Sequence, residues 1–217
     1  MAPAYLFHLG YDAVLRGGAR PGSRVLVIGL GALGLAAVAM AGIAGARVFA
    51  LSDQPAPSRR AQLLGASVYD RKQCAQLETA LTSGLADVII VTTDAWSDWH
   101  LALKLAGIRA TIACLGFPGR GLPPPEFNPL ESRTFYVKQL RVEAVGLSPE
   151  RADSRGFLRF NERDNLAYIL ELLGSGRLSA STLVSGIYPG VEIERAYSDL
   201  LARCESPVTY LLEWNRE

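Results

Sequence analysis

Short apolar runs alternate with helix-like segments over the first 115 residues of the chain. The runs are rich in Val, Ile, Leu and Ala, and polar turns separate them from the segments with helical periodicity. Continuous apolar runs are typical of parallel strands that are buried on both faces. We therefore expect a βαβ series with strands at 25–28, 48–51, 68–69, 87–91 and 110–115, and helices at 32–44, 72–81 and 97–106.

The pattern changes after residue 116. Residues 117–129 contain five prolines and two glycines, which predicts an ordered surface loop. Regular structure resumes at 139–145. Two further amphipathic helices are expected at 165–173 and 191–202, and a terminal strand at 208–212.

Three glycines follow the first apolar run with the spacing G-x-G-x-x-G. Gly29 ends the run, Gly31 opens the next helix, and Gly34 lies within that helix, beyond Ala32 and Leu33. In this setting the first glycine permits a tight turn, the second lets the backbone approach a pyrophosphate, and the third lets helix and strand pack closely. The helix N-terminus adds free N–H groups and a positive dipole end.

Two alternatives compete with dinucleotide binding. The 22 residues between Arg24 and Arg47 carry no charge and are long enough to cross a membrane, but five glycines, seven alanines and the glycine turn argue against a membrane helix. A glycine turn used for packing alone is the second alternative. We predict an α/β fold with two parts. Residues 1–148 form a dinucleotide-binding Rossmann domain, a doubly wound parallel sheet with a lead-in helix. Residues 149–217 form a small C-terminal α+β extension.

The composition narrows the class of protein. The chain of 217 residues has 22 basic and 21 acidic residues, a net charge of +1, which predicts no nucleic-acid or membrane-surface partner. Cys74, Cys114 and Cys204 are too far apart for a Cys-x-x-Cys pair and are expected to be reduced thiols. The N-terminus has no secretion signal, so we expect a cytoplasmic protein.

Several segments, taken in order, resemble the medium-chain dehydrogenase/reductase family, typified by zinc alcohol, polyol and threonine dehydrogenases. The segments that carry the resemblance are Pro21–Gly29, Ala61–Ala66, Asp87–Thr92, Ala110–Gly116 and Ile193–Tyr197. The resemblance implies a nicotinamide cofactor and hydride transfer with a small alcohol, polyol or ketone. It also implies that the strand ends at Thr92, Thr93, Leu115, Gly116 and Phe117 line the cofactor.

The chain departs from the family in its length. Members begin with a barrel-like domain, of about 150 residues as is usual for a domain, that supplies the zinc ligands. This sequence starts just before the cofactor domain, so we expect a truncated, zinc-independent form or one that pairs with a separate catalytic-domain subunit. His8 and His100 are the only histidines and are too few to build a zinc site alone.

The choice between NAD and NADP depends on the tip of the second strand. Family members that prefer NAD have an acidic residue where this chain has Ser52, and Asp53 comes one position later. Serine there resembles the members that prefer NADP, but the family's basic position is Pro57 here, and Arg59 and Arg60 come later. The sequence therefore predicts NADP or NAD, with NADP slightly preferred.

Two further groups of residues are candidates for catalysis or capping. The polar segment after the fourth strand is a candidate for substrate contact. Alternatively, Asp94 or Ser97 in this segment caps the following helix. Tyr136 and Lys138 are candidate proton donors, since a carbonyl reduced without zinc still needs an acid. A pair of surface residues is the alternative for these two.

We expect an NAD(P)-dependent oxidoreductase that acts on a small-molecule substrate. Its rivals are a non-catalytic dinucleotide-binding protein or partner subunit, and a non-redox enzyme that reuses the cleft. Without a barrel domain, Leu183, Val184, Ile187 and residues 208–212 are expected to expose apolar surface. The resemblance also implies a homodimer through an edge strand near 139–146.

Overall fold

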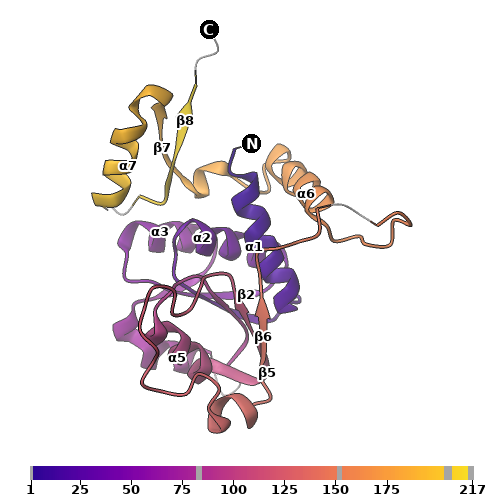
Figure 1. Cartoon of the computed structure of the whole chain (residues 1–217), viewed down its shortest axis with the longest axis vertical. Helices are drawn as coiled ribbons and strands as arrows, with labels where there is room; N and C mark the ends of the chain where they lie inside the picture. Colours follow the sequence, from indigo (N-terminus) through magenta and orange to yellow (C-terminus); the bar gives the residue numbers. More distant parts are fainter. Residues whose placement is uncertain (1, 82–84, 151–152, 203–206, 215–217) are drawn as a thin grey trace.

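A six-stranded parallel sheet forms the centre of the molecule (Figure 1). The computed structural model describes residues 2–81, 85–150, 153–202 and 207–214. The strand order is β3-β2-β1-β4-β5-β6, the order of dinucleotide-binding sheets. The strands are β1 (Arg24–Ile28), β2 (Arg47–Leu51), β3 (Ser67–Tyr69), β4 (Ala86–Val91), β5 (Ala106–Cys114) and β6 (Arg141–Ala144). The predicted Rossmann-type fold is confirmed, and the segment near 139–146 supplies the edge strand.

Helices cover both faces of the sheet because the side chains of each strand alternate between them. In β1, Val25 and Val27 point into one core and Leu26 and Ile28 into the other. The first core lies under α1 (Ala4–Gly17), α2 (Ala32–Ile43) and α3 (Pro55–Leu63). The second lies under α4 (Cys74–Ala80), which follows a short turn η1 (Arg71–Gln73), and α5 (Trp96–Leu105).

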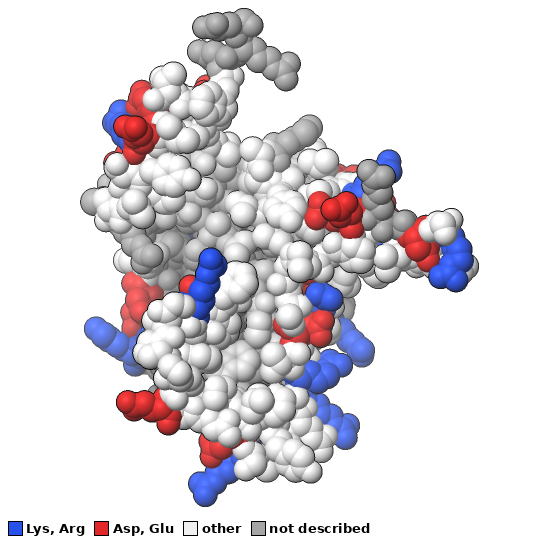
Figure 2. Space-filling model, viewed as in Figure 1, with Lys and Arg blue, Asp and Glu red and all other residues white. Residues whose placement is uncertain are grey.

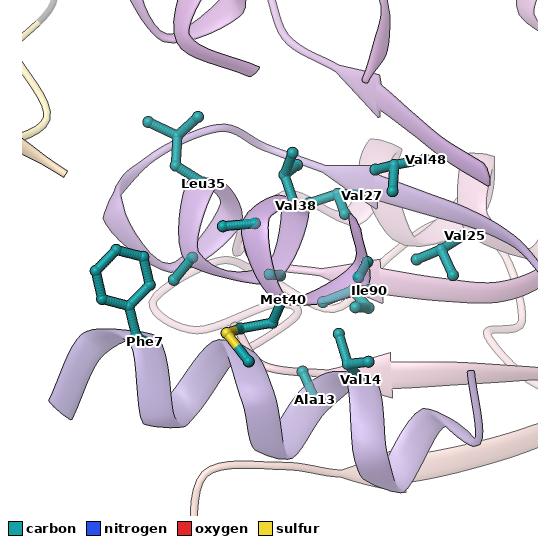
Figure 3. Close-up of a cluster of buried hydrophobic side chains, with 14 of the residues drawn as sticks. Phe7, Ala13, Val14, Val25, Val27, Leu35, Val38, Met40, Val48 and Ile90 are labelled. Atoms are coloured by element: carbon teal, nitrogen blue, oxygen red, sulfur yellow. The ribbon is translucent and has the colours of Figure 1, made fainter. Parts of the chain in front are cut away.

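The first core depends on a close crossing between α1 and α2 (Figure 3). Phe7, Ala13 and Val14 of α1 pack against α2 and the sheet, and Met40 of α2 points back toward α1. A Cβ on Gly10 would lie 2.6 Å from the backbone of Ala36 in α2. Only glycine therefore fits at this crossing without moving a helix.

The proline-rich loop is ordered against α5, as its composition predicted. Trp96 donates its ring N–H to the carbonyl of Pro123 at 3.0 Å, and the backbone N–H of Gly119 reaches the carbonyl of Asp94 at 2.7 Å. A π-helical turn, η3 (Ser132–Tyr136), then leads into β6. β5 begins at Ala106, directly after α5, and includes Arg109 with a φ of 62°.

The C-terminal part contains a strand that the sequence pattern did not predict. After α6 (Glu162–Gly174) and the turn η4 (Ala180–Thr182), β7 (Val184–Pro189) pairs in parallel with β8 (Thr209–Glu213). The turn η5 (Gly190–Glu192) and α7 (Ile193–Ala202) connect them, and Figure 1 shows this unit above α2 and α3.

The predicted exposure of the C-terminal apolar residues is correct only in part. Ile187 is 64% exposed, whereas Leu183 is buried completely because it joins the first core. Val184 and residues 208–212 are half-buried. The prediction failed for Leu183 because α6 and η4 pack on this chain's own helices.

The charge distribution on the surface and the apolarity of the helices relate to the expectation of no nucleic-acid or membrane-surface partner. Acidic and basic side chains are intermingled around the face in Figure 2, with no large region of one sign. In the described part of the chain, none of the helices combines the length and apolarity needed to cross a bilayer.

The crossing of α1 and α2 gives a stability prediction. Gly10→Ala should lower the free energy of unfolding by about 1–3 kcal/mol, because the methyl group overpacks the crossing. Gly174→Ala is the matched control, since a Cβ on this helical glycine meets nothing within 4 Å. Urea unfolding followed by circular dichroism measures both, and equal stability of the two variants would contradict the packing argument.

Candidate functional site

A pocket of about 700 Å³ lies at the carboxyl ends of the strands. In open α/β sheets this edge is where ligands bind, at the point where the strand order reverses. The pocket lies beside the ends of β1, β2 and β4. Its walls are Gly29, Leu30, Gly31, Ala32, Leu33, Ser52, Asp53, Gln54, Arg71, Thr92, Thr93, Leu200, Leu201, Pro207 and Val208.

The glycine turn has the geometry that its spacing predicted. Gly29 has a φ of 89°, and a Cβ there would lie within 2.7 Å of both Thr92 and Thr93. A Cβ on Gly34 would lie 1.9 Å from the carbonyl oxygen of Gly29, so helix and strand are in direct backbone contact. A Cβ on Gly31 meets nothing within 4 Å, because this residue faces the open pocket.

The N-terminus of α2 opens into the pocket. Gly31 is its N-cap and provides no side-chain hydrogen bond, and the first helical bond runs from Leu35 N–H to the Gly31 carbonyl at 2.9 Å. The N–H groups of the first turn therefore have no partner within the helix, and the helix dipole favours an anion beside them. An open cradle of this kind fits a pyrophosphate.

Ser52 and Asp53 lie at the end of β2, on the pocket wall. Ser52 is 9% exposed, and its hydroxyl oxygen accepts the backbone N–H of Gln54 at 3.1 Å, which shapes the turn into α3. The Asp53 carboxylate accepts the side chain and the backbone N–H of Arg71. Ser52 and Asp53, which the sequence placed at this strand tip, therefore both lie on the pocket wall, but they have different hydrogen-bond partners.

Arg71 is a pocket residue that the sequence analysis missed. Its Nε and Nη2 donate to the two oxygens of Asp98 at 3.1 and 2.8 Å, and its Nη1 donates to Asp53. The hydrogen bonds to Asp98 first, and those to Asp53, raise the pKa of Arg71 above its ordinary value. Its position two residues after β3, at the carboxyl edge of the sheet, was the available signal.

Thr92 and Thr93 support the turn from the end of β4. The Thr92 hydroxyl donates to the carbonyl oxygens of Ile28 and Gly29 at 3.0 and 3.1 Å. The Thr93 hydroxyl donates to Asp98 at 2.7 Å, which completes the group around Arg71.

The capping alternative for Asp94 and Ser97 is wrong. The N-cap of α5 is Ala95, which makes no side-chain hydrogen bond there. Asp94 instead accepts the backbone N–H of Phe117 at 3.2 Å and so connects β4 to the loop after β5. Asp94 was a cap candidate because it precedes the helix, but its carboxylate turns toward the neighbouring strand end.

Leu115, Gly116 and Phe117 lie next to the pocket rather than on its wall. Gly116 donates to the carbonyl of Val91 at 2.8 Å, and a Cβ on it would lie 2.6 Å from the backbone of Thr92. Phe117 is 62% exposed. The end of β5, which the family resemblance assigned to the cofactor, thus contacts the pocket residue Thr92.

Tyr136 and Lys138 are not brought to the pocket. Lys138 Nζ donates to the carbonyls of Leu103, Lys104 and Ala106, each at 2.9 Å, where α5 ends and β5 begins. This is the amino edge of the parallel sheet, opposite the pocket, and burial lowers the pKa of Lys138 there. Tyr136 is 79% exposed in η3. The placement gives Lys138 a structural role at the end of α5.

The C-terminal segment supplies an apolar wall that the sequence did not predict. Leu200 and Leu201 come from the end of α7, and Pro207 and Val208 precede β8. They lie far from the glycine turn in sequence, and only the packing of the β7–α7–β8 unit over α2 and α3 brings them to the pocket.

The residue types that bind metals are dispersed. Among the described residues, no cluster of three or more His, Cys, Asp or Glu side chains is positioned to hold a metal ion. His8 is buried in α1, and burial lowers its pKa. Cys74 and Cys114 carry free thiols, and burial raises the pKa of Cys114 to about 11, while Cys204 lies outside the described residues. The described part of the chain therefore does not fit a zinc site of its own.

Comparison with known proteins agrees with this geometry. Residues 32–163 match the family model for zinc-binding dehydrogenases. Two curated relatives from Mycolicibacterium smegmatis, NADP-dependent alcohol dehydrogenases C 1 and C 2, are each 31% identical over 147 residues. The matched region is 68% of this chain and 41% of each relative, so the chain spans less than half the length of these relatives.

Solved structures show the same fold. 2R,3R-butanediol dehydrogenase from Bacillus subtilis has a TM-score of 0.80 and 20% identity over 99% of this chain and 57% of that one. Alcohol dehydrogenase TADH from Thermus sp. ATN1 has a TM-score of 0.75 and 24% identity over 97% of this chain and 56% of that one. With the glycine turn, the strand order and the family match in agreement, the chain belongs to the zinc-binding dehydrogenases of the medium-chain dehydrogenase/reductase family, through their cofactor-binding region.

Proposed function

We propose that the pocket binds NADP(H) or NAD(H), with the pyrophosphate at the N-terminus of α2. The observation that carries this proposal is the open space at Gly31 beside the unpartnered N–H groups of the first helical turn. Ser52 at the strand tip, in place of an acid, supports a slight preference for NADP. The names of the Mycolicibacterium relatives, which are NADP-dependent, support the same preference.

The proposed reaction is hydride transfer between the nicotinamide and a small alcohol, polyol or ketone. The cofactor supplies the hydride chemistry, while the chain binds and orients it. The glycine turn holds the phosphates, and Leu200, Leu201 and Val208 form an apolar side of the pocket. Lys138, a candidate acid from the sequence, lies at the other edge of the sheet, away from this pocket.

We further propose that this chemistry uses no zinc held by the chain itself. The dispersed His and Cys side chains of the described residues support this proposal. Alternatively, the chain performs the same hydride transfer together with a separate subunit that supplies the catalytic domain. A non-catalytic dinucleotide-binding protein and a non-redox enzyme in the same cleft are the rivals, and measured turnover separates them.

We propose that two copies pair through β6. Among the described strands β6 pairs only with β5, so no strand covers its other edge, where Arg16 of α1 donates to the carbonyl of Ala144 at 2.8 Å, and Val142 is 42% exposed. A symmetric antiparallel pairing centred on Val142 would place Arg141 opposite Glu143 of the partner subunit. Opposite charges across such a pair are favourable, so the strand is complementary to itself.

The first prediction tests cofactor binding. Gly31→Val should abolish binding of NADPH and NADH, because its side chain would enter the space proposed for the pyrophosphate, and should leave the melting temperature nearly unchanged. Gly42→Val is the control, since Gly42 lies in the same helix, is exposed and is not on the pocket wall. Fluorescence titration measures both, and retained binding by Gly31→Val would refute the assigned phosphate position.

A second prediction concerns catalysis. Chelator-treated protein should oxidise NADPH or NADH with at least one member of a panel of small ketones and aldehydes, as followed by absorbance. Turnover that requires added zinc would contradict the zinc-independent form. Tight cofactor binding without turnover on any member would favour the non-catalytic rival.

A third prediction concerns assembly. Light scattering should give twice the 23.4 kDa mass of one chain, and Val142→Lys should give the single mass, because it places two like charges together at the centre of the pairing. Val142→Thr should remain dimeric. A wild-type mass of 23.4 kDa at micromolar concentration would overturn the dimer.

A further inference from the structure

Arg71 is held by two carboxylates that differ in exposure. The Asp98 side chain is 2% exposed and meets the guanidinium through two hydrogen bonds, one to each oxygen. The Asp53 side chain is 49% exposed and meets it through Nη1 alone. Buried Asp98 is therefore a permanent partner, because separating it would leave an unpaired buried charge. Asp53 is the partner that can be exchanged.

The strengths of the two contacts support this distinction. The Arg71–Asp53 pair is partly exposed, so water and salt screen it. A phosphate offers a guanidinium more acceptor oxygens and more negative charge than a carboxylate does, and it often accepts two parallel hydrogen bonds. A phosphate group that reached Arg71 would thus displace Asp53, and Asp98 would keep the guanidinium in place.

The position of the pair indicates which phosphate this would be. Asp53 follows Ser52 at the end of β2, where dinucleotide-binding folds hold the adenosine ribose and its 2′ position. The backbone N–H of Arg71 also donates to Asp53 at 3.2 Å, so η1 and the β2 tip are directly connected. Both residues line the pocket.

The two arginines that follow the β2 tip in sequence do not compete for this role. Arg60 donates to the carbonyl of Thr182 at 3.2 Å and to the hydroxyl of Ser185 at 3.1 Å, which connects α3 to the C-terminal unit. Arg59 is exposed on α3, and neither is part of the pocket wall. Arg71 is the cation on that wall among the described residues.

We propose that Arg71 is the residue that recognises the 2′-phosphate of NADP(H), by exchanging Asp53 for the phosphate while Asp98 fixes the guanidinium. This inference rests on the proposed cofactor binding. It explains how a chain without a basic residue at Pro57 accommodates a 2′-phosphate next to Asp53. It assigns Asp53 the role of a competitor whose removal favours the phosphorylated cofactor.

Calorimetry with two adenosine fragments tests the proposal. Adenosine 2′,5′-bisphosphate and adenosine 5′-monophosphate differ only in the 2′-phosphate, and the wild-type chain should bind the first about tenfold more tightly. Asp53→Asn should increase that ratio, because the competing charge is gone. Arg71→Gln combined with Asp98→Asn, which avoids an unpaired buried carboxylate, should reduce the ratio to about one, and Arg59→Gln is the matched control that should leave it unchanged.

The outcomes separate this inference from the function on which it depends. Equal affinity of the wild-type chain for the two fragments, with NADH and NADPH both bound, would overturn the role of Arg71 and leave cofactor binding intact. A lower ratio in Asp53→Asn would overturn it as well. Absence of binding by any nucleotide would overturn both. If the double variant does not fold, Arg71→Lys keeps a cation beside Asp98 and should still lower the ratio, and an unchanged ratio would refute the proposal.

Discussion

The packing of α2 against its neighbours is the constraint on which the rest of the structure depends. Backbone meets backbone on two sides of this helix: at Gly34, which meets the Gly29 carbonyl at the end of β1, and at Gly10 of α1, which meets Ala36. The helix can approach its neighbours this closely because glycine or alanine stands at each of these contacts. The approach fixes the N-terminus of α2 beside the end of β1, and that position creates the phosphate cradle.

Charge organises the other side of the pocket. Arg71 connects the tip of β2, through Asp53, to α5 and the end of β4, through Asp98 and Thr93. Arg60 of α3 donates hydrogen bonds to the C-terminal unit, and the same unit provides the apolar wall of the pocket. The pocket thus combines a backbone cradle, a fixed guanidinium and an apolar cover, which suits a ligand that has both phosphates and flat rings.

The sequence predicted those features that local patterns determine. Val25 to Ile28 are apolar on both faces, and the glycine spacing after them specified the turn, so the sheet and the cradle followed. It did not predict β7, because Val184–Pro189 contains Gly186 and Pro189 and has no clear alternation. Arg71 and Leu200 were missed because their place in the pocket depends on which strands and helices become neighbours. The sequence also left the position of Lys138 open, since nothing local shows at which edge of a sheet a residue will lie.

The central claim is that the first turn of α2 holds the cofactor's phosphates, and a crystal structure of the chain with NADPH tests it most directly. The account predicts pyrophosphate oxygens within hydrogen-bond distance of the backbone N–H groups of Ala32 and Leu33, in the space beside Gly31. A cofactor whose pyrophosphate lies elsewhere in the structure, with the Gly31 side of the cleft empty, would contradict it.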